Sequence, residues 1–475
     1  MKKSTRKVAY LLAFVSAGFS ALHFYRIRSA GGVILAVPKI VAGALAPFLI
    51  IAGLVGAALS LLARTPLALA ASVFGVGASA RYLWRVVTAA GDFSQAFGSG
   101  WYDRISPLQA SRMLQGRWTW RPARPPEPRW KRDVPLYTIA GRGGPGSERS
   151  LIADIWQPPA GVAPSGLAFI YFHGSGWHFL DKDVGTRPMF RHLAAQGHVI
   201  MDVAYRMCPE TEWWGMLADV KHAIAWMKAN ASRYGVDPAH IVLGGGSAGA
   251  HLALLAAYTP QCDNLTPVAL KDADLSVRGV VSWYGPTDMN VYYRYAGRLL
   301  SSIVGEGEET PAAQLQQRLM AMLGFDMSPP AHWQPGLTVQ DAMMRALLGG
   351  RPDEVPDVYR RASPVTYAAP GCPPTLLLQG EHDSFVSAEA VRALAAKLRE
   401  AGVPVVHVEY PQTEHAFDIV LPRLSPAAQA ALYETERFLA LLATEPVTAA
   451  PRHYSGSLRR DSLELQLGQE DFARG

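Results

Sequence analysis

Three residues far apart in the chain have the types and the order that nucleophilic acyl transfer requires. Ser247 is the centre of a GxSxG pentapeptide (245–249) that follows an apolar run ending at Leu243 and precedes an Ala- and Leu-rich segment. A serine hydroxyl is a weak nucleophile, so the chain must present it on a sharp strand-to-helix turn, where glycines remove side chains that would clash. The sequence therefore predicts that Ser247 is a nucleophile.

A serine nucleophile needs a base and a group that orients the base, and Ser247 is followed by candidates in the order Asp, then His. Asp383 follows the apolar run 374–379, and His415 follows the apolar run 405–410. Both positions lie just beyond the carboxyl ends of expected parallel strands, where open α/β sheets bind ligands. We predict that His415 is the base and that Asp383 orients it.

Other charged residues beside this predicted triad are interpreted as structural. Glu381 and Glu414 are the competing carboxylates, but their positions are more typical of a solvated loop. His382 and His407 are interpreted as surface or strand residues. The expected orienting group therefore stays Asp383.

Acyl transfer also develops negative charge on the carbonyl oxygen, so fixed N–H donors must surround that oxygen. The segment 173–177, His-Gly-Ser-Gly-Trp, follows a third apolar run and offers such a turn. We predict that the backbone N–H groups of Gly174, Ser175 and Ala248 form the oxyanion hole. His173 and His178 lack the carboxylates or third histidine of a metal site, so we expect no metal and no other cofactor.

The elements that must position these residues alternate between short β-branched or apolar runs and longer helical patterns. This alternation predicts an α/β domain over residues 134–445, with a mainly parallel sheet covered on both faces. The first two strands are close enough to be antiparallel neighbours. Eight strands are expected, at 134–139, 151–156, 167–172, 199–203, 240–243, 279–283, 374–379 and 405–410, with helices at 216–234, 248–258 and 388–401 among them.

Several of these segments together resemble the hormone-sensitive-lipase-like branch of the α/β-hydrolases. Members of that family carry an HGGG loop, a YRLAPE-like segment, a GDSAG elbow, and then Asp and His. This chain has HGSG at 173–176, YRMCPE at 205–210 and GGSAG at 245–249, so Ser175 replaces a glycine and Gly246 an acid. The resemblance covers about residues 134–440 and implies an α/β-hydrolase fold and cofactor-independent carboxylic ester hydrolysis through an acyl-enzyme.

Two other functions remain open on the same scaffold. The HGSGW segment is also similar to the HGGxW loop of kynurenine formamidases, so an amidase or peptidase could use the same triad. A non-catalytic ligand-binding protein is the second alternative, since plant hormone receptors resemble this family. Such receptors typically lose the histidine, whereas His415 is present here.

Residues 286–362 lie between the sixth and seventh expected strands, where this fold often inserts a cap over the acyl pocket. Helices are expected there at 314–323 and 339–348. Their methionines either shape an adaptable apolar pocket or belong to a plain helical core. These are Met320, Met322, Met343 and Met344. The resemblance implies short to medium acyl esters as small-molecule substrates.

Before this domain, residues 8–87 are almost continuously apolar, in a chain that is 49% hydrophobic and 18% charged. Residues 40–63 are long enough to cross about 30 Å of hydrocarbon. Residues 67–87 are nearly long enough to cross it if the side chains of Arg81 and Arg85 reach the headgroups. Residues 8–25 are a third span, an interfacial segment, or a signal sequence cleaved after Ala17. We therefore predict a membrane-anchoring region at 1–100, with two or three transmembrane helices and membrane lipid as a partner.

The remaining segments are a linker and a tail. Residues 101–133 are rich in Arg, Pro and Trp, which suits either a headgroup surface or a solvated spacer. Residues 446–475 are polar and are expected to form a loose tail. The net charge of +6 is concentrated before residue 133, so nucleic acid is not an expected partner.

The basic residues also predict on which side of the membrane the catalytic domain lies, because Lys and Arg in short loops stay on the cytoplasmic side. If only residues 40–63 and 67–87 span the membrane as a hairpin, every basic residue of this region except Arg64 lies on one side. This topology predicts a cytoplasmic catalytic domain.

Overall fold

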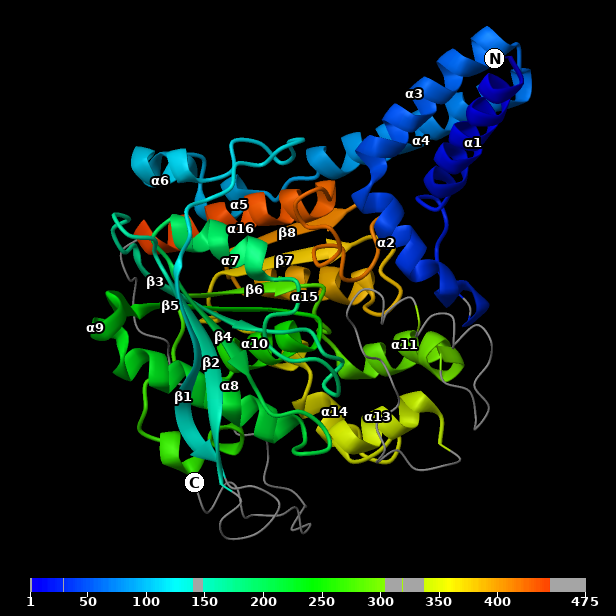
Figure 1. The fold of residues 1–475 in the computed structure, drawn as a ribbon. Helices are drawn as coiled ribbons and strands as arrows, with labels where there is room; N and C mark the ends of the chain where they lie inside the picture. Colours follow the sequence, from blue (N-terminus) through cyan, green and yellow to red (C-terminus); the bar gives the residue numbers. More distant parts are fainter. Residues whose placement is uncertain (1, 29, 140–147, 304–317, 319–336, 445–475) are drawn as a thin grey trace.

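An eight-stranded sheet forms the centre of the computed structural model, which describes all residues except 1, 29, 140–147, 304–317, 319–336 and 445–475 (Figure 1). The strand order is β1-β2-β4-β3-β5-β6-β7-β8. β1 and β2 pair antiparallel, as do β2 and β4, and the other neighbours are parallel. The strands are β1 Arg129–Ile139, β2 Arg149–Gln157, β3 Gly166–Phe172, β4 Val199–Ala204, β5 Val236–Gly246, β6 Gly279–Trp283, β7 Thr375–Gly380 and β8 Val405–Tyr410. The predicted mainly parallel sheet is confirmed.

Two strands begin earlier than their sequences indicate. β1 starts at Arg129 and not at residue 134, because its first half is an exposed edge without the alternation that marks a half-buried strand. β5 starts at Val236, and its Asp237 and Pro238 read as a turn in the sequence. The parallel strands buried on both faces were easier to predict.

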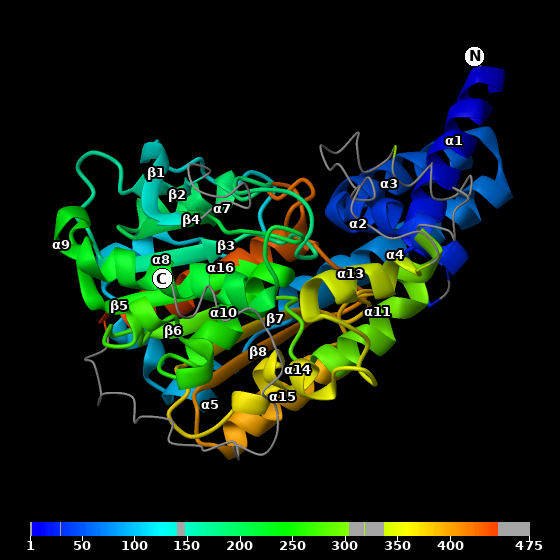
Figure 2. The same cartoon turned by 90° about the horizontal axis from the view of Figure 1, so that it is seen from below.

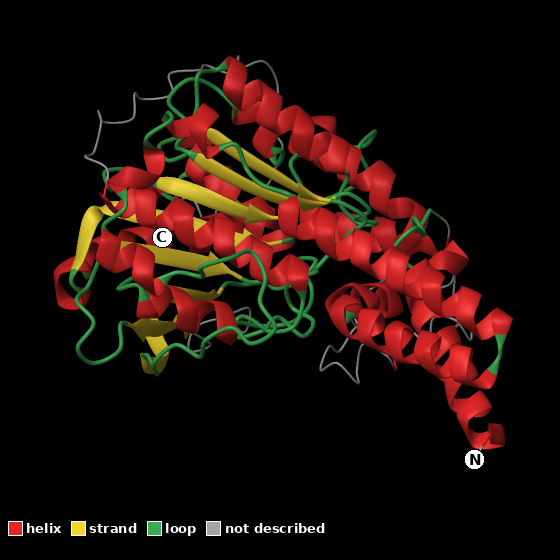
Figure 3. Cartoon of the chain, turned by 90° about the horizontal axis from the view of Figure 1, so that it is seen from above, coloured by secondary structure: helices red, strands yellow, loops and turns green. Residues whose placement is uncertain are grey.

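Helices cover both faces of the sheet, as the views along it show (Figures 2 and 3). One face packs against α8 (Trp213–Ala229), α10 (Ala248–Tyr258) and α15 (Ala388–Glu400), and the other packs against α7 (Arg187–Ala195) and α16 (Pro426–Thr444). The helix expected at 216–234 is broken at Asn230, where α9 (Ala231–Tyr234) begins. The shorter helices are η1 (Ala30–Leu35), α5 (Phe93–Phe97), η2 (Trp101–Arg104), α6 (Pro107–Arg112), η3 (Asp263–Leu265), η4 (Val268–Leu270) and η5 (Pro364–Tyr367).

The region between β6 and β7 contains α11 (Met289–Ile303), α13 (Val339–Leu348) and α14 (Pro356–Arg361). α13 has the bounds that were predicted, whereas the helix expected at 314–323, with Met320 and Met322, lies outside the described residues apart from residue 318. Met343 and Met344 are buried in the main core, so the plain-core interpretation holds for them. The Met343 methyl carbon nevertheless lies 3.4 Å from where a Cβ of Gly176 would stand, against the predicted oxyanion loop.

The N-terminal helices form an arm that projects from the α/β body (Figure 1). α1 (Lys2–Ala21), α3 (Ala46–Ala63) and α4 (Pro66–Thr88) pack side by side in it. By length and composition, α3 and the helical stretch that begins at Pro66 could each cross a membrane. The outer faces of the arm carry exposed apolar side chains, among them Leu11, Phe14, Leu54, Leu62, Val73 and Phe74. An apolar surface of this extent is typical of contact with another protein or with lipid.

This arm differs in two ways from the expected hairpin. The span expected at 40–63 is two helices, because α2 (Ala36–Ala44) ends before Pro47, and the chain turns there into α3. Residues 8–25, for which a third span, an interfacial segment and a signal sequence were left open, lie mostly in α1, which packs along α3 and α4. Ser16 Oγ donates to Leu49 O at 2.9 Å, and Ser20 Oγ donates to Gly75 O at 3.0 Å.

The Arg- and Trp-rich segment packs on the α/β body, which differs from the expected headgroup-facing linker or solvated spacer. Arg117 pairs with Glu434 at 2.8 Å, and the Leu114 backbone N–H donates to Glu436 at 2.7 Å. Both carboxylates lie on α16 and are buried. Because a buried carboxylate needs a partner, these contacts hold the segment to the hydrophobic body.

Candidate active site

Ser247 stands on a strained turn between β5 and α10, with φ 50° and ψ −118°. Such a backbone conformation is costly for a residue with a side chain and is typical of functional sites. The turn is tight, since a Cβ on Gly249 would stand 2.0 Å from Phe172 O. Gly246 is less crowded, and its Cβ would meet the Tyr171 hydroxyl at 3.2 Å. The sequence thus forms a nucleophile elbow, and the acid that is usual at position 246 in the resembling family is not needed for it.

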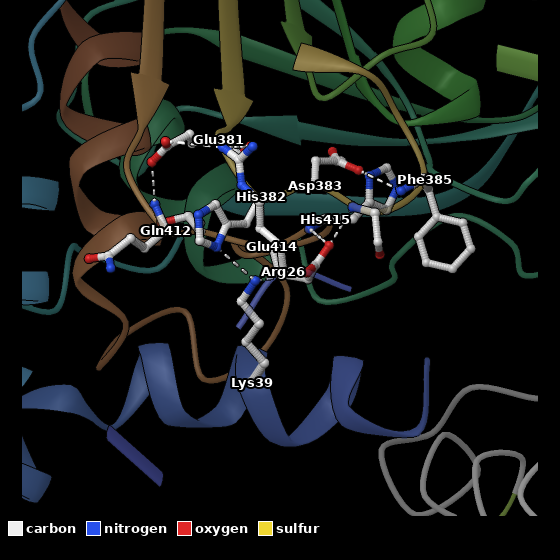
Figure 4. Close-up of polar contacts among 12 residues, drawn as sticks. Arg26, Lys39, Glu381, His382, Asp383, Phe385, Gln412, Glu414 and His415 are labelled. Carbon is white, nitrogen blue, oxygen red and sulfur yellow. Dashed lines mark hydrogen bonds and ion pairs between the residues drawn. The ribbon is translucent and has the colours of Figure 1, made fainter. Parts of the chain in front are cut away.

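The three predicted triad residues meet at the carboxyl ends of β5, β7 and β8. His415 Nε2 lies 3.0 Å from Ser247 Oγ, and His415 Nδ1 lies 2.8 Å from Asp383 Oδ2. Figure 4 shows His415 and Asp383 facing each other. This is the geometry in which a histidine takes the serine proton through Nε2 while the carboxylate holds Nδ1–H.

Asp383 is fixed by hydrogen bonds that use both of its carboxylate oxygens. Oδ1 accepts from the backbone N–H groups of Phe385 and Val386 at 2.9 and 2.7 Å, and Oδ2 also accepts from Gln379 Nε2 at 3.0 Å. The Tyr295 hydroxyl donates to the Asp383 carbonyl at 2.7 Å. With its side chain only 1% exposed, Asp383 has a single orientation toward the histidine.

Charges around His415 favour its protonated form. Burial lowers the pKa of His415, but the charge of Asp383 and its hydrogen bond outweigh burial, and Glu414 and Asp418 add to them, so that the pKa is raised above the usual 6.5. Tyr284 packs against the imidazole with ring centroids 4.6 Å apart, and its hydroxyl donates to Asp418. An imidazolium at this position is therefore stabilised from several sides.

The predicted oxyanion donors lie beside the nucleophile. A Cβ on Gly174 would stand 3.1 Å from Gly246 O and 3.4 Å from Ser247 Cβ, so the backbone of this loop lies directly against the Ser247 turn. Within the described part of the chain, no acceptor takes a hydrogen bond from the backbone N–H of Gly174, Ser175 or Ala248. Donors without a partner next to a nucleophile are suited to binding a developing oxyanion.

The side chain of Ser175 is held by Tyr205, the first residue of the YRMCPE segment. Ser175 Oγ lies 2.7 Å from the Tyr205 hydroxyl and accepts from the Trp177 backbone N–H at 2.9 Å, while the Tyr205 hydroxyl donates to His173 O at 2.9 Å. The serine thus adds two anchors to the loop in place of the flexibility of glycine. Burial lowers the pKa of His173 to about 4, which is consistent with a neutral structural histidine.

One interpretation of the competing carboxylates is wrong. Glu414 is not in a solvated loop: its side chain is 2% exposed and forms an ion pair with Lys39 Nζ at 3.1 Å. No sequence pattern indicates this contact, because the two residues are far apart and in different predicted regions. Glu381 is partly exposed and pairs with Arg26 at 3.1 Å. Tyr284 and Gln379 were also missed, since no short motif contains them.

Comparisons with known proteins identify the family to which the chain belongs. The family model BD-FAE matches residues 153–320 and 325–398, about half of the chain. Among curated proteins of Mycobacterium tuberculosis, the probable carboxylic ester hydrolase LipM is 32% identical over 63% of this chain and 60% of that protein. Esterase LipQ is 31% identical over 58% of this chain and 56% of that protein. The chain thus spans roughly three fifths of the length of these relatives.

Solved structures of similar shape include esterases. Esterase B from Lactobacillus rhamnosis has a TM-score of 0.48 at 19% identity, over 68% of this chain and 88% of that chain. The carboxylesterase EstE1, cloned from a metagenomic library, has a TM-score of 0.46 at 22% identity, over 71% of this chain and 94% of that chain. On its sheet, its elbow and the family match, the chain has an α/β-hydrolase fold and belongs to the BD-FAE family.

Proposed function

We propose that this chain is a membrane-anchored serine hydrolase that cleaves carboxylic esters through Ser247, His415 and Asp383. The observation that carries the proposal is the continuous contact from Ser247 Oγ to His415 Nε2 at 3.0 Å and from His415 Nδ1 to Asp383 at 2.8 Å. The esterase names of the relatives support the same reaction class. An intact histidine speaks against a non-catalytic binding protein on this fold.

In the proposed acylation step, Ser247 Oγ attacks the ester carbonyl carbon while His415 Nε2 takes the serine proton. The carbonyl oxygen becomes an oxyanion that the N–H groups of Gly174, Ser175 and Ala248 bind. As the tetrahedral intermediate collapses, the imidazolium gives its proton to the leaving alcohol. Water, deprotonated by His415, then hydrolyses the acyl-enzyme and restores the serine.

The proposed substrates are esters of short to medium acyl chains. This proposal comes from the family resemblance, in which a cap bounds the acyl pocket, and it is supported by the position of α13 against the predicted oxyanion loop. His178 Nε2 lies 3.3 Å from Met343 O, and this contact ties the cap region to that loop. Amide or peptide cleavage by the same triad is the alternative that a substrate panel distinguishes.

The test is active-site labelling followed by a substrate panel. The full-length protein in detergent should react with a fluorophosphonate at Ser247 and should hydrolyse p-nitrophenyl esters with a preference for short to medium acyl groups. Labelling at another serine would contradict the assigned nucleophile. Faster hydrolysis of matched anilides than of esters would replace the esterase proposal with the amidase alternative.

Membrane anchoring by the N-terminal arm is the second part of the proposal. If α3 and α4 alone span, the basic residues place the catalytic domain on the cytoplasmic side, which is the topology we propose. The packing of α1 along both helices favours a three-span alternative, in which the N-terminus and the catalytic domain lie on opposite sides. Reporters fused after Arg132 decide: active alkaline phosphatase with a silent fluorescent protein would mean export and would overturn the cytoplasmic assignment.

A further inference from the structure

A buried ion pair joins the N-terminal region to the loops of the proposed triad. Lys39 on α2 lies 3.1 Å from Glu414 Oε2, and both side chains are 2% exposed. Removing two charges from water is costly, so a pair of this kind is stable only with good geometry and further hydrogen bonds. Both partners have such bonds, and all of them lead to the triad loops (Figure 4).

The second oxygen of Glu414 binds one backbone N–H from each triad loop. Oε1 accepts from Ser384 N at 2.6 Å and from His415 N at 3.1 Å. Ser384 directly follows Asp383, so one carboxylate connects the residue beside the proposed acid with the proposed base itself. The distance between Asp383 and His415 thus depends on where this carboxylate is held.

Lys39 also contacts the residue before Asp383. Its Nζ lies 3.2 Å from His382 Nδ1. Burial and the charges of Lys39 and Arg26 lower the pKa of His382 to about 4, so the imidazole is neutral near pH 7 and accepts a hydrogen bond from the ammonium. Lys39 therefore holds the residues that immediately precede both Asp383 and His415.

Further contacts from the same N-terminal region reach these loops. Arg26 pairs with Glu381, whose other oxygen accepts from the Gln412 backbone N–H at 2.9 Å, and Arg81 Nη1 donates to Gln412 Oε1 at 3.0 Å. The Tyr82 hydroxyl lies 3.3 Å from Thr413 Oγ1. The loop after β7 and the loop after β8 are thus both held from outside the α/β body, and the Lys39–Glu414 contact is the buried ion pair among these contacts.

We propose that Lys39 is a positioning residue for the catalytic triad, acting through Glu414, so that the membrane-anchoring region is a structural part of the active site. The proposal rests on the proposed ester hydrolysis. The short motifs around Ser247, Asp383 and His415 do not include Lys39, which precedes the nearest of them by more than 200 residues.

The test is a double-mutant cycle on the full chain in detergent micelles, with active sites counted by fluorophosphonate labelling and turnover measured on a soluble p-nitrophenyl ester. Lys39→Met leaves Glu414 buried without its cation. We expect kcat per labelled site to fall about 10- to 100-fold, because small displacements of catalytic groups have effects of this size. KM should change less than threefold. Glu414→Gln keeps an acceptor for both backbone N–H groups. In the double variant Lys39→Met/Glu414→Gln, we expect kcat within about tenfold of the parent.

Arg117→Met is the matched control, because it also leaves a buried carboxylate, Glu434, without its cation, but it lies away from the triad loops. It should lower the melting temperature to a similar extent while kcat per labelled site stays unchanged. Equal kcat per labelled site in Lys39→Met and Arg117→Met would overturn the positioning role. If Lys39→Met yields no labelled protein, the double variant is compared with Glu414→Gln alone. A kcat in the double variant that is lower than that of Glu414→Gln by tenfold or more would mean that Lys39 does not act through Glu414.

The result separates this inference from the proposed function. If Ser247→Ala loses activity and labelling while the Lys39 variants keep full turnover per site, only the positioning role fails. If Ser247→Ala stays active, the assigned nucleophile itself fails, whatever the Lys39 variants do.

Discussion

The two halves of the active site are held in place by different physical means. On the nucleophile side, the ends of β3 and β5 approach so closely that Gly249 has no room for a Cβ and Gly174 has little, and backbone packing fixes Ser247. On the acid–base side, the loops after β7 and β8 are held by charged side chains, with Lys39 contributed from the N-terminal region.

This difference explains why one half is visible as a motif and the other is not. Close backbone packing demands particular small residues at adjacent positions, so it leaves a short contiguous pattern such as GxSxG. The contacts that hold the loops after β7 and β8, here called the polar clamp, are Lys39–Glu414 and Arg26–Glu381. Such contacts require only opposite charges at two positions, and those positions can be hundreds of residues apart. The five predictions that follow test each half, in order of decreasing effect.

The largest effect should come from removing the nucleophile, which disables both halves together. Ser247→Ala is expected to lower kcat by about 10⁵- to 10⁶-fold and to abolish fluorophosphonate labelling. A p-nitrophenyl ester assay and gel detection of the label measure the two losses. Residual labelling of the variant at the parent rate would show that another residue is the nucleophile.

Within the acid–base half, the base should matter more than the group that orients it. His415→Ala is expected to lower kcat by about as much as Ser247→Ala, whereas Asp383→Asn should lower it by about 10⁴-fold, because His415, the oxyanion donors and substrate binding remain. Circular dichroism should show that each variant is folded. If Asp383→Asn retained more than a tenth of the parent rate, another group would orient His415, and Glu414 would be the first to examine.

The nucleophile half is tested by comparing two glycines within one turn. Gly249→Ala would place a methyl group 2.0 Å from Phe172 O, so we expect a loss of about 3 kcal/mol or more and little labelled protein. Gly246→Ala meets the hydroxyls of Tyr171 and Tyr284 at 3.2 and 3.3 Å, which are the ends of side chains and not backbone, so this variant should remain folded and active. Thermal melts measure both, and equal stability would contradict the tight packing assigned to the turn.

The charge around the base sets the pH dependence. Only neutral His415 can take the serine proton, and its pKa is raised, so kcat/KM should rise with pH through a midpoint above 6.5. Asp418 contributes to that raised pKa, so Asp418→Asn should move the midpoint to lower pH. A pH profile of each enzyme checks the direction, and an unmoved midpoint would remove Asp418 from the electrostatics of the site.

The smallest effect is expected at the exposed edge of the polar clamp. The Arg26–Glu381 pair has side chains 42% and 26% exposed, so Arg26→Gln should cost about 0–1 kcal/mol and change kcat less than threefold. Arg124→Gln, in the more exposed Arg124–Glu127 pair, is the control. A tenfold loss of turnover in Arg26→Gln, with no loss in Arg124→Gln, would mean that Arg26 also holds the triad loops in position.

The same contrast decides how much could be read from the sequence. The eight strands, α13, and the order of Ser247, Asp383 and His415 were predictable, because periodicity and short motifs report local structure. Glu414 was predicted to lie in a solvated loop, because its partner, Lys39, belongs to a region whose sequence predicts membrane-spanning helices. The linker was misread for the same reason, since Arg117 meets Glu434 only after α16 packs on the sheet.

The contact between α2 and the triad loops also bears on modularity. A boundary near residue 133 suggests that the anchor could be cut away or exchanged for another tether. Such a shortened chain would lose Lys39 together with α2 and α4, so the Glu414 carboxylate would face water and the loops after β7 and β8 would lose the contacts that hold them. A soluble form should therefore need other contacts for these loops, and exchange of anchors between relatives should succeed only when α2 moves together with the loop that it holds.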